Sequence, residues 1–145
     1  MVASTAERFD IEGAAPIELE LPVAAGVKCY KGTLLIYNDA GYAQPGGDTV
    51  LGRLAGECAR TVDNSSGVDG AVKVPVIPPA RLRLIELDAV SPTDAWNGDN
   101  AYLTDDHTVA LGSSVANNVH AGQIVAVITK AVAGRVVIDT NRRAD

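Results

Sequence analysis

Short runs of alternating apolar and polar residues, separated by turn-forming residues, are the feature of this sequence that most limits its fold. From Ile17 to Val23, apolar side chains at every second position alternate with Glu18, Glu20 and Pro22. A period of two places one set of side chains on one face of a β-strand. Pro22 has no N–H to donate, so we expect this strand to lie at the edge of a sheet.

The rest of the chain repeats this pattern at close spacing, with Gly, Asn, Asp and Pro in the intervening turns. A hairpin is expected over residues 33–43, with its turn at 38–41, because the turn residues there are those that hairpins use. A second hairpin is expected over residues 101–111, with the residues Asp-Asp-His at its turn. The other expected strands cover residues 54–62, 72–76, 82–87, 124–129 and 136–140.

Two segments interrupt the regular strands. The apolar positions change parity at Leu84–Ile85, which predicts a β-bulge or a sheet corner at this point. The segment 88–102 contains two helix-capping residues, Ser91 and Asp94, so we expect one short helical turn that ends at Asn97-Gly98. This segment is the single helix candidate in the sequence.

These elements predict an all-β fold, which is a small barrel or sandwich of mostly antiparallel short strands with at most one short helix. A chain of 145 residues is long enough for one packed domain. Residues 1–15 show no periodicity and carry Phe9 and Ile11 as isolated bulky apolar residues. We therefore expect a flexible N-terminal arm at residues 1–15 and a single β domain at residues 16–145.

Charge and composition exclude several classes of partner. The net charge of −6 and the pI near 4.8 would repel a phosphate backbone, so we expect no nucleic-acid partner. No run approaches the roughly 20 apolar residues that span a bilayer, so we expect no membrane partner. The first residues also lack the order of a secretory signal. Cys29 and Cys58 form no metal-binding pattern, and we expect two small buried side chains rather than a disulfide or a zinc site.

The sequence holds few side chains that could support catalysis. His107 and His120 are its two histidines, and it has no phosphate-binding glycine loop and no nucleophile elbow. Asp105, Asp106 and His107 form the densest titratable cluster and could hold a cation, but Asp also favours a hairpin turn because it accepts backbone N–H groups. We therefore predict a protein that is not an enzyme, with no catalytic residue, no metal site and no cofactor.

Trp96 is the sole tryptophan and lies in a turn-rich segment. An exposed aromatic side chain at this position would mark a surface that contacts a partner. A buried one would instead pin the loop onto the β domain. Both interpretations are open at this point, and Trp96 is a possible surface-contact residue.

Four segments of the chain follow one another in an informative order. They are KGTLLIYNDAGYAQP at 31–45, LGRLAGECARTVDNSSGVDGAVKVPV at 51–76, NAYLTDDHTVALGSS at 100–114 and AGQIVAVITKAVAGRVVID at 121–139. In this order the segments resemble the capsid decoration, or cement, proteins of tailed phages and prophages. The resemblance covers roughly residues 30–140, but residues 75–97 are longer and more charged than the family pattern.

The resemblance implies a structural virion protein with no catalytic residues. Members of this family form trimers on the outer surface of the expanded capsid and stabilise the coat-protein lattice. The expected partners are the major capsid protein and further copies of the chain, in a homotrimer. The expected location is the exterior of the virion, after synthesis in the host bacterial cytoplasm. We hypothesise that the arm orders on the coat protein through Arg8, Phe9 and Ile11, by adding a strand to an exposed sheet edge.

An alternative is a carbohydrate- or cell-surface-binding β-domain of a virion. Such a domain would use exposed aromatic rings as stacking platforms. The candidate rings are those of Trp96, Tyr37, Tyr42 and Tyr102. Aromatic residues make up only 4% of the chain, which makes this alternative the weaker one. A third class, a small trimeric enzyme of unrecognised type, would need a deep pocket that holds a strongly perturbed acid or histidine.

Overall fold

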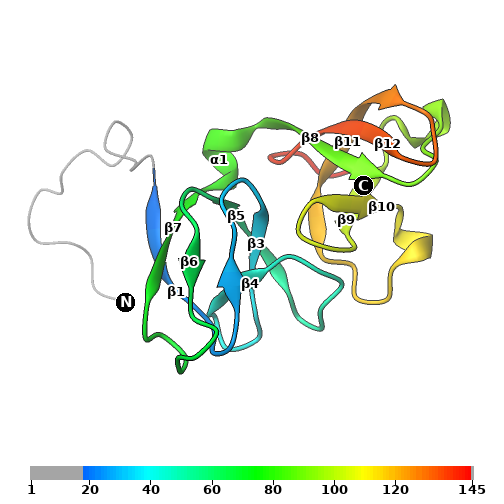
Figure 1. Ribbon diagram of the computed structural model, residues 1–145. Coiled ribbons are helices and arrows are strands. Elements are labelled where there is room, and N and C mark those ends of the chain that lie inside the picture. Colours follow the sequence, from blue (N-terminus) through cyan, green and yellow to red (C-terminus); the bar gives the residue numbers. More distant parts are fainter. Residues whose placement is uncertain (1–17, 145) are drawn as a thin grey trace, which may run out of the picture.

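The computed structural model describes residues 18–144, which fold into short strands connected by turns and a few helical turns. Figure 1 shows a sheet built from the N-terminal half of the chain beside a barrel built from the C-terminal half. The predicted all-β fold class with mostly antiparallel strands is confirmed. The arm predicted at residues 1–15 lies outside the described residues.

The sheet is antiparallel throughout. In spatial order it consists of β1 (Leu19–Pro22), β7 (Lys73–Ile77), β5 (Arg53–Cys58), β3 (Leu34–Tyr37) and β4 (Ala43–Pro45). Because β1 is an end strand and Pro22 faces Lys73 of β7, the predicted edge position of Pro22 is confirmed. The first predicted hairpin is also confirmed, since Tyr37 pairs with Ala43 between β3 and β4. A separate antiparallel pair is formed by β2 (Lys28–Cys29) and β6 (Val62–Asp63).

The barrel is closed, and one of the pairs of neighbouring strands among its described residues is parallel. Around the barrel lie β10 (Thr108–Ala110), β8 (Leu84–Ala89), β12 (Gly134–Asp139), β11 (His120–Thr129) and β9 (Asn100–Leu103). The second predicted hairpin is β9 with β10, and the last two predicted strands pair as β11 with β12. Strands β8 and β10 run parallel. Register shifts along β11 mark irregularities of the kind that bend a strand into a small barrel.

The chain crosses from the sheet to the barrel through α1 (Pro79–Leu82), a single helical turn (Figure 1). Proline suits the start of a helix, because the N–H that it lacks would have no partner in the first turn. Arg83 ends α1 with a φ of 54° and turns the chain into β8. The bulge expected as one alternative at Leu84–Ile85 is wrong, because β8 pairs with β12 in unbroken register. The expected strand over residues 82–87 begins only at Leu84, because Leu82 belongs to α1. The parity change marks the passage from helix to strand.

The helical turn predicted in segment 88–102 is present as a 3-10 turn, η1 (Asp94–Trp96). The predicted cap is wrong, because Thr93 is the N-cap residue and no side chain caps the turn. Ser91 instead has a φ of 47° in the preceding bend. A second 3-10 turn, η2 (Gly112–Ser114), follows β10. Within residues 18–144, no helix has the length and apolar character needed to cross a bilayer.

Strand β3 contributes to both hydrophobic cores of the described chain. Leu35 belongs to the sheet core, whereas Leu34 and Ile36 belong to the barrel core, because successive side chains of a strand face opposite ways. The sheet core also contains Val23, Cys29, Ala43, Ala55, Cys58, Val74 and Val76. The barrel core also contains Leu87, Ala89, Ala101, Leu103, Val109, Val119, Ala121, Ile124, Val136 and Ile138.

Two glycines in the β4–β5 loop allow the sheet and the barrel to approach closely. A Cβ atom at Gly46 would lie 3.1 Å from Leu103 Cδ1 and 3.1 Å from the Leu34 carbonyl oxygen. A Cβ atom at Gly52 would lie 3.0 Å from Ile36 Cδ1. Close-packed interiors tolerate such overlap poorly. A larger residue at either position would therefore require its neighbours in β3 or the barrel to shift.

We predict that Leu35→Ala lowers the free energy of unfolding by about 2–5 kcal/mol, because Leu35 is 0% exposed and its loss leaves a cavity. The control is Leu84→Ala, since Leu84 is 59% exposed and its truncation should change stability by less than about 0.5 kcal/mol. Urea unfolding followed by circular dichroism measures both values. Equal losses in the two variants would contradict the assignment of Leu35 to the sheet core.

Candidate functional site at the junction of sheet and barrel

The turn between β9 and β10 lies where the barrel meets the sheet. The Leu34 N–H of β3 donates a hydrogen bond to the Asp106 carbonyl oxygen over 2.8 Å. On the barrel side, the Asp88 N–H of β8 donates to the His107 carbonyl oxygen over 3.0 Å. The three residues Asp105, Asp106 and His107, called the acidic turn from here on, therefore connect β3 to β8 through their backbone.

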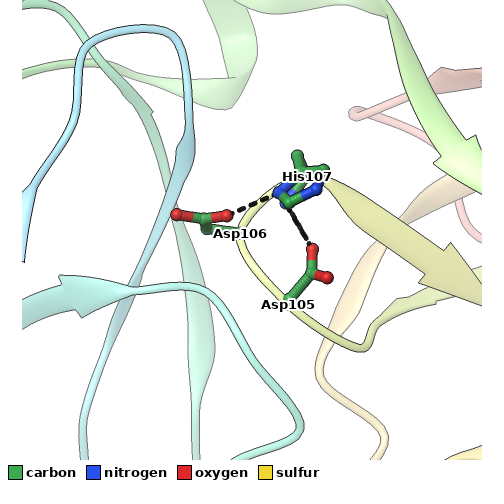
Figure 2. A group of neighbouring side chains, drawn as sticks. All are labelled: Asp105, Asp106 and His107. Atoms are coloured by element: carbon green, nitrogen blue, oxygen red, sulfur yellow. Dashed lines mark hydrogen bonds and ion pairs between the residues drawn. The ribbon is translucent and has the colours of Figure 1, made fainter.

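The side chains of the acidic turn converge on the His107 ring, as Figure 2 shows. His107 Nδ1 lies 2.7 Å from Asp106 Oδ1 and 3.2 Å from Asp105 Oδ1. An ionised carboxylate can only accept, so we infer that Nδ1 carries a hydrogen and donates it to Asp106. On the other side of the ring, Nε2 lies 4.0 Å from Asp88 Oδ2. Asp88 is also 3.4 Å from Arg135 Nε on β12.

The local sequence explains why the chain turns here. Asp105 Oδ1 accepts the backbone N–H of His107 over 2.9 Å, which is the contact by which Asp stabilises tight turns. The Thr104 N–H then donates to the Thr108 carbonyl oxygen over 2.9 Å and closes the hairpin. The hairpin-turn interpretation of this segment is therefore confirmed, and the same turn also orients the two carboxylates.

The surroundings of the two histidines shift their pKa values in opposite directions. The hydrogen bond with Asp106, aided by the charges of Asp105, Asp106 and Asp88, raises the pKa of His107 above its usual 6.5. Burial lowers the pKa of His120, and the nearby charge of Arg143 adds to this effect. His107 therefore carries the larger positive charge at neutral pH. Its side chain is 57% exposed, so solvent screens these interactions and each is modest in energy.

The acidic turn is also the group of described residues with the spacing to hold a metal ion. One ligand atom from each of its three residues lies within 4.8 Å of the others. A cation bound at Nδ1 would have to displace the Nδ1 proton and break the ion pairs of His107 with Asp105 and Asp106, since metal ligands must be deprotonated. The absence of a metal site therefore stays a prediction. The direct ion pairs of His107 favour this prediction.

A second polar contact joins the sheet and the barrel through the β4–β5 loop. The Asp48 carboxylate accepts the backbone N–H groups of Ala116 over 2.8 Å and of Asn117 over 2.7 Å. The Asn117 side chain returns a hydrogen bond to the Asp48 carbonyl oxygen over 2.9 Å. The two backbone hydrogen bonds lower the pKa of Asp48. Sequence reasoning missed this contact because its partners lie 68 and 69 positions apart.

Among the exposed apolar side chains are two pairs that sequence reasoning also missed. Val50 and Leu51 are 65% and 63% exposed at the tip of the β4–β5 loop, and Leu51 has a φ of 57°. On the barrel, Val90 and Val132 line a surface groove of about 390 Å³. Valine and leucine in a turn carry no periodic signal, so nothing in the sequence distinguished them from core residues.

The predicted contact residues fall in two groups. Arg8, Phe9 and Ile11 lie outside the described residues. Trp96 is half-buried on η1 and packs against the barrel core. Its position favours the interpretation that it pins this loop to the barrel.

The candidate rings for sugar binding do not form an open platform. Tyr37, Tyr42 and Tyr102 are each partly buried. The Arg53 guanidinium lies 5.8 Å from the Tyr37 ring centre, and the Tyr102 ring meets the His120 ring edge-on at 5.7 Å. Sugar stacking needs a free ring face. The arrangement of these rings therefore gives the carbohydrate-binding alternative no specific support.

The two cysteines lie in the sheet core as free thiols, in agreement with the sequence prediction. Burial raises the pKa of Cys29 to about 11, with a further contribution from Cys58. Burial also raises the pKa of Cys58. Thiols rather than thiolates are therefore present at neutral pH, and both residues act as small apolar side chains.

The acidic turn is the candidate functional site, because it places His107 beside two carboxylates and bonds the sheet to the barrel. Comparisons with protein-family models, with curated proteins and with solved structures found no match. The arrangement has a clear chemical capability, which is to bind or release a proton at His107 beside three carboxylates.

We predict that divalent cations leave the stability of the protein unchanged. Thermal unfolding in EDTA and in excess Zn²⁺ or Ca²⁺ should give the same Tm, because the ion pairs of His107 already occupy the ligand atoms. Asp105→Asn serves as the control variant. A rise in Tm with a cation that is absent in Asp105→Asn would show that the acidic turn binds metal.

Proposed function

We propose that this protein is a structural virion protein that binds the outer surface of an expanded tailed-phage capsid as a homotrimer and stabilises the coat-protein lattice. The observation that carries the proposal is the ordered resemblance of four segments to phage decoration proteins. In this proposal the protein catalyses no reaction, and its partners are the major capsid protein and other copies of itself. It is made in the host bacterial cytoplasm and resides on the exterior of the virion.

The spatial arrangement of the resembling segments supports this proposal. Segment 31–45 contains the β3–β4 hairpin and segment 100–114 contains the β9–β10 hairpin. These two hairpins meet at the 2.8 Å hydrogen bond between the Leu34 N–H and the Asp106 carbonyl oxygen. Segments 51–76 and 121–139 supply further strands of the same sheet and barrel. The resemblance therefore falls on residues that build one shared framework, rather than on scattered turns.

Stabilising a capsid in this way requires binding alone. A ligand that binds the assembled lattice, and not its separated subunits, stabilises the lattice by mass action. Three linked copies bind more tightly than one, because the first contact raises the effective concentration at the second and third. A folded β framework suits this task, because the domain itself loses little conformational entropy when it binds, and the cost of ordering falls on the arm alone.

We predict that the purified protein co-sediments with expanded tailed-phage capsids and not with unexpanded precursors of the same phage. The expected reason is that expansion creates the coat-protein surface that the trimer recognises. Sedimentation followed by gel densitometry measures the bound fraction, and analytical ultracentrifugation of the free protein measures its oligomeric state. Equal binding to both particles, or to neither, would contradict the proposal.

We also predict that deletion of residues 2–14 abolishes capsid binding while the β domain stays folded. The hypothesis places the apolar contacts on Phe9 and Ile11, so the double variant Phe9→Ala/Ile11→Ala should weaken binding strongly. Ser4→Ala/Thr5→Ala is the matched control in the same segment and should bind as the natural protein does. Circular dichroism verifies the fold. Undiminished capsid binding by the truncated protein would show that the arm is not the contact.

A further inference from the structure

We propose that the acidic turn is a pH-sensitive latch between the sheet and the barrel, which holds β3 while His107 is protonated and loosens when His107 loses its proton. The proposal goes beyond capsid binding and does not depend on it. It rests on the position of the turn, on the side chains around His107 and on the backbone bonds that the turn makes to both parts of the fold.

The backbone of the turn is the mechanical part of the latch. Asp106 accepts the Leu34 N–H from the sheet, and the adjacent His107 accepts the Asp88 N–H from the barrel, over 2.8 and 3.0 Å. The Asp105 carbonyl oxygen lies close to the β4–β5 loop as well, 3.3 Å from where a Cβ atom of Gly46 would be. A shift of this short turn would therefore lengthen bonds on both sides together.

The side chains of the turn are the titrating part. Protonated His107 faces the carboxylates of Asp105, Asp106 and Asp88, and Arg135 is paired with Asp88. These are the charged groups in contact around the ring from the turn, β8 and β12. With His107 protonated, two cations face three anions. Once the proton leaves, Arg135 alone faces three carboxylates, and their repulsion favours an open turn.

The sign of the effect follows from the direction of the titration. The hydrogen bond with Asp106 raises the pKa of His107 in the folded protein above 6.5. A raised pKa means that the stabilisation is fully present below pH 6.5 and is lost as the pH rises through the folded-state value. The hydrogen bonds from Ala116 and Asn117 lower the pKa of the Asp48 carboxyl, so this carboxylate stays ionised throughout this range. Loosening is therefore expected at the acidic turn and not along the whole junction.

Amide hydrogen exchange of the Leu34 N–H tests the latch, because this group donates directly to Asp106. Its protection factor, corrected for intrinsic exchange, should fall by about 1.5- to 5-fold as the pH rises through the titration of His107. That range corresponds to the roughly 0.2–1 kcal/mol of an exposed ion pair. The Ala24 N–H, which bonds to the Ala43 carbonyl oxygen at the start of β4, is the reference and should show no such fall.

Three variants separate the latch from other titrations. His107→Gln should make the protection of Leu34 nearly independent of pH, and Asp106→Asn should reduce its pH dependence, because Asp105 and Asp88 still face the His107 ring in that variant. His120→Gln should leave the pH dependence as it is in the natural protein, because His120 contacts Asn100 rather than the acidic turn. NMR titration of the His107 ring locates its pKa and verifies that Asp106→Asn lowers it. A flat Leu34 profile in the natural protein, equal falls at Leu34 and Ala24, or pH dependence that survives His107→Gln would overturn the proposal.

Discussion

The rest of the structure depends on the burial of β3 on both of its faces. Leu34, Leu35 and Ile36 are each no more than 2% exposed, and burial of each such side chain contributes about 1.5–3 kcal/mol. Strands β5 and β4 flank β3 within the sheet, while the barrel packs on the side of Leu34 and Ile36. Both cores therefore contain side chains of β3. Apolar packing of Leu34 and Ile36 brings the barrel against the sheet. The hydrogen bonds at Asp106 and Asp48 then fix how the barrel is positioned there.

Much of the fold could be predicted because its signals are local. The alternation in β1 and the turn residues of the two hairpins identify elements over fewer than a dozen neighbouring positions. The double burial of β3 has no such signal, because its apolar residues are consecutive and do not show which face meets which core. The helical turn α1 was missed because its four residues are too few to show a helical period. The local signal for it was a pair of prolines, Pro78 at the N-cap and Pro79 at the first helical position. Because α1 ends just before β8 begins, it explains why the apolar positions of the sequence change parity at Leu84–Ile85.

The candidate site could be predicted only as far as its own three residues. Asp105, Asp106 and His107 are adjacent, so their clustering and their turn geometry are visible in the sequence. Their partners are not, since Leu34, Asp88 and Arg135 come from other strands and meet the turn only in the folded barrel. The contact between Asp48 and Asn117 is hidden for the same reason. Long-range polar contacts depend on topology, and no local pattern encodes it.

The single crossing at α1 has a consequence for synthesis of the chain. The sheet strands end at Ile77 and the barrel strands begin at Leu84, so the ribosome completes the sheet before the barrel. Strand β12 lies between β8 and β11, and the barrel therefore cannot close until the last strand has emerged. During that interval the nascent sheet presents Leu34 and Ile36 to solvent, as an apolar strip that chaperones or neighbouring nascent chains can bind. The order of the elements thus leaves the apolar face of β3 without its partner from the completion of the sheet until β12 has emerged.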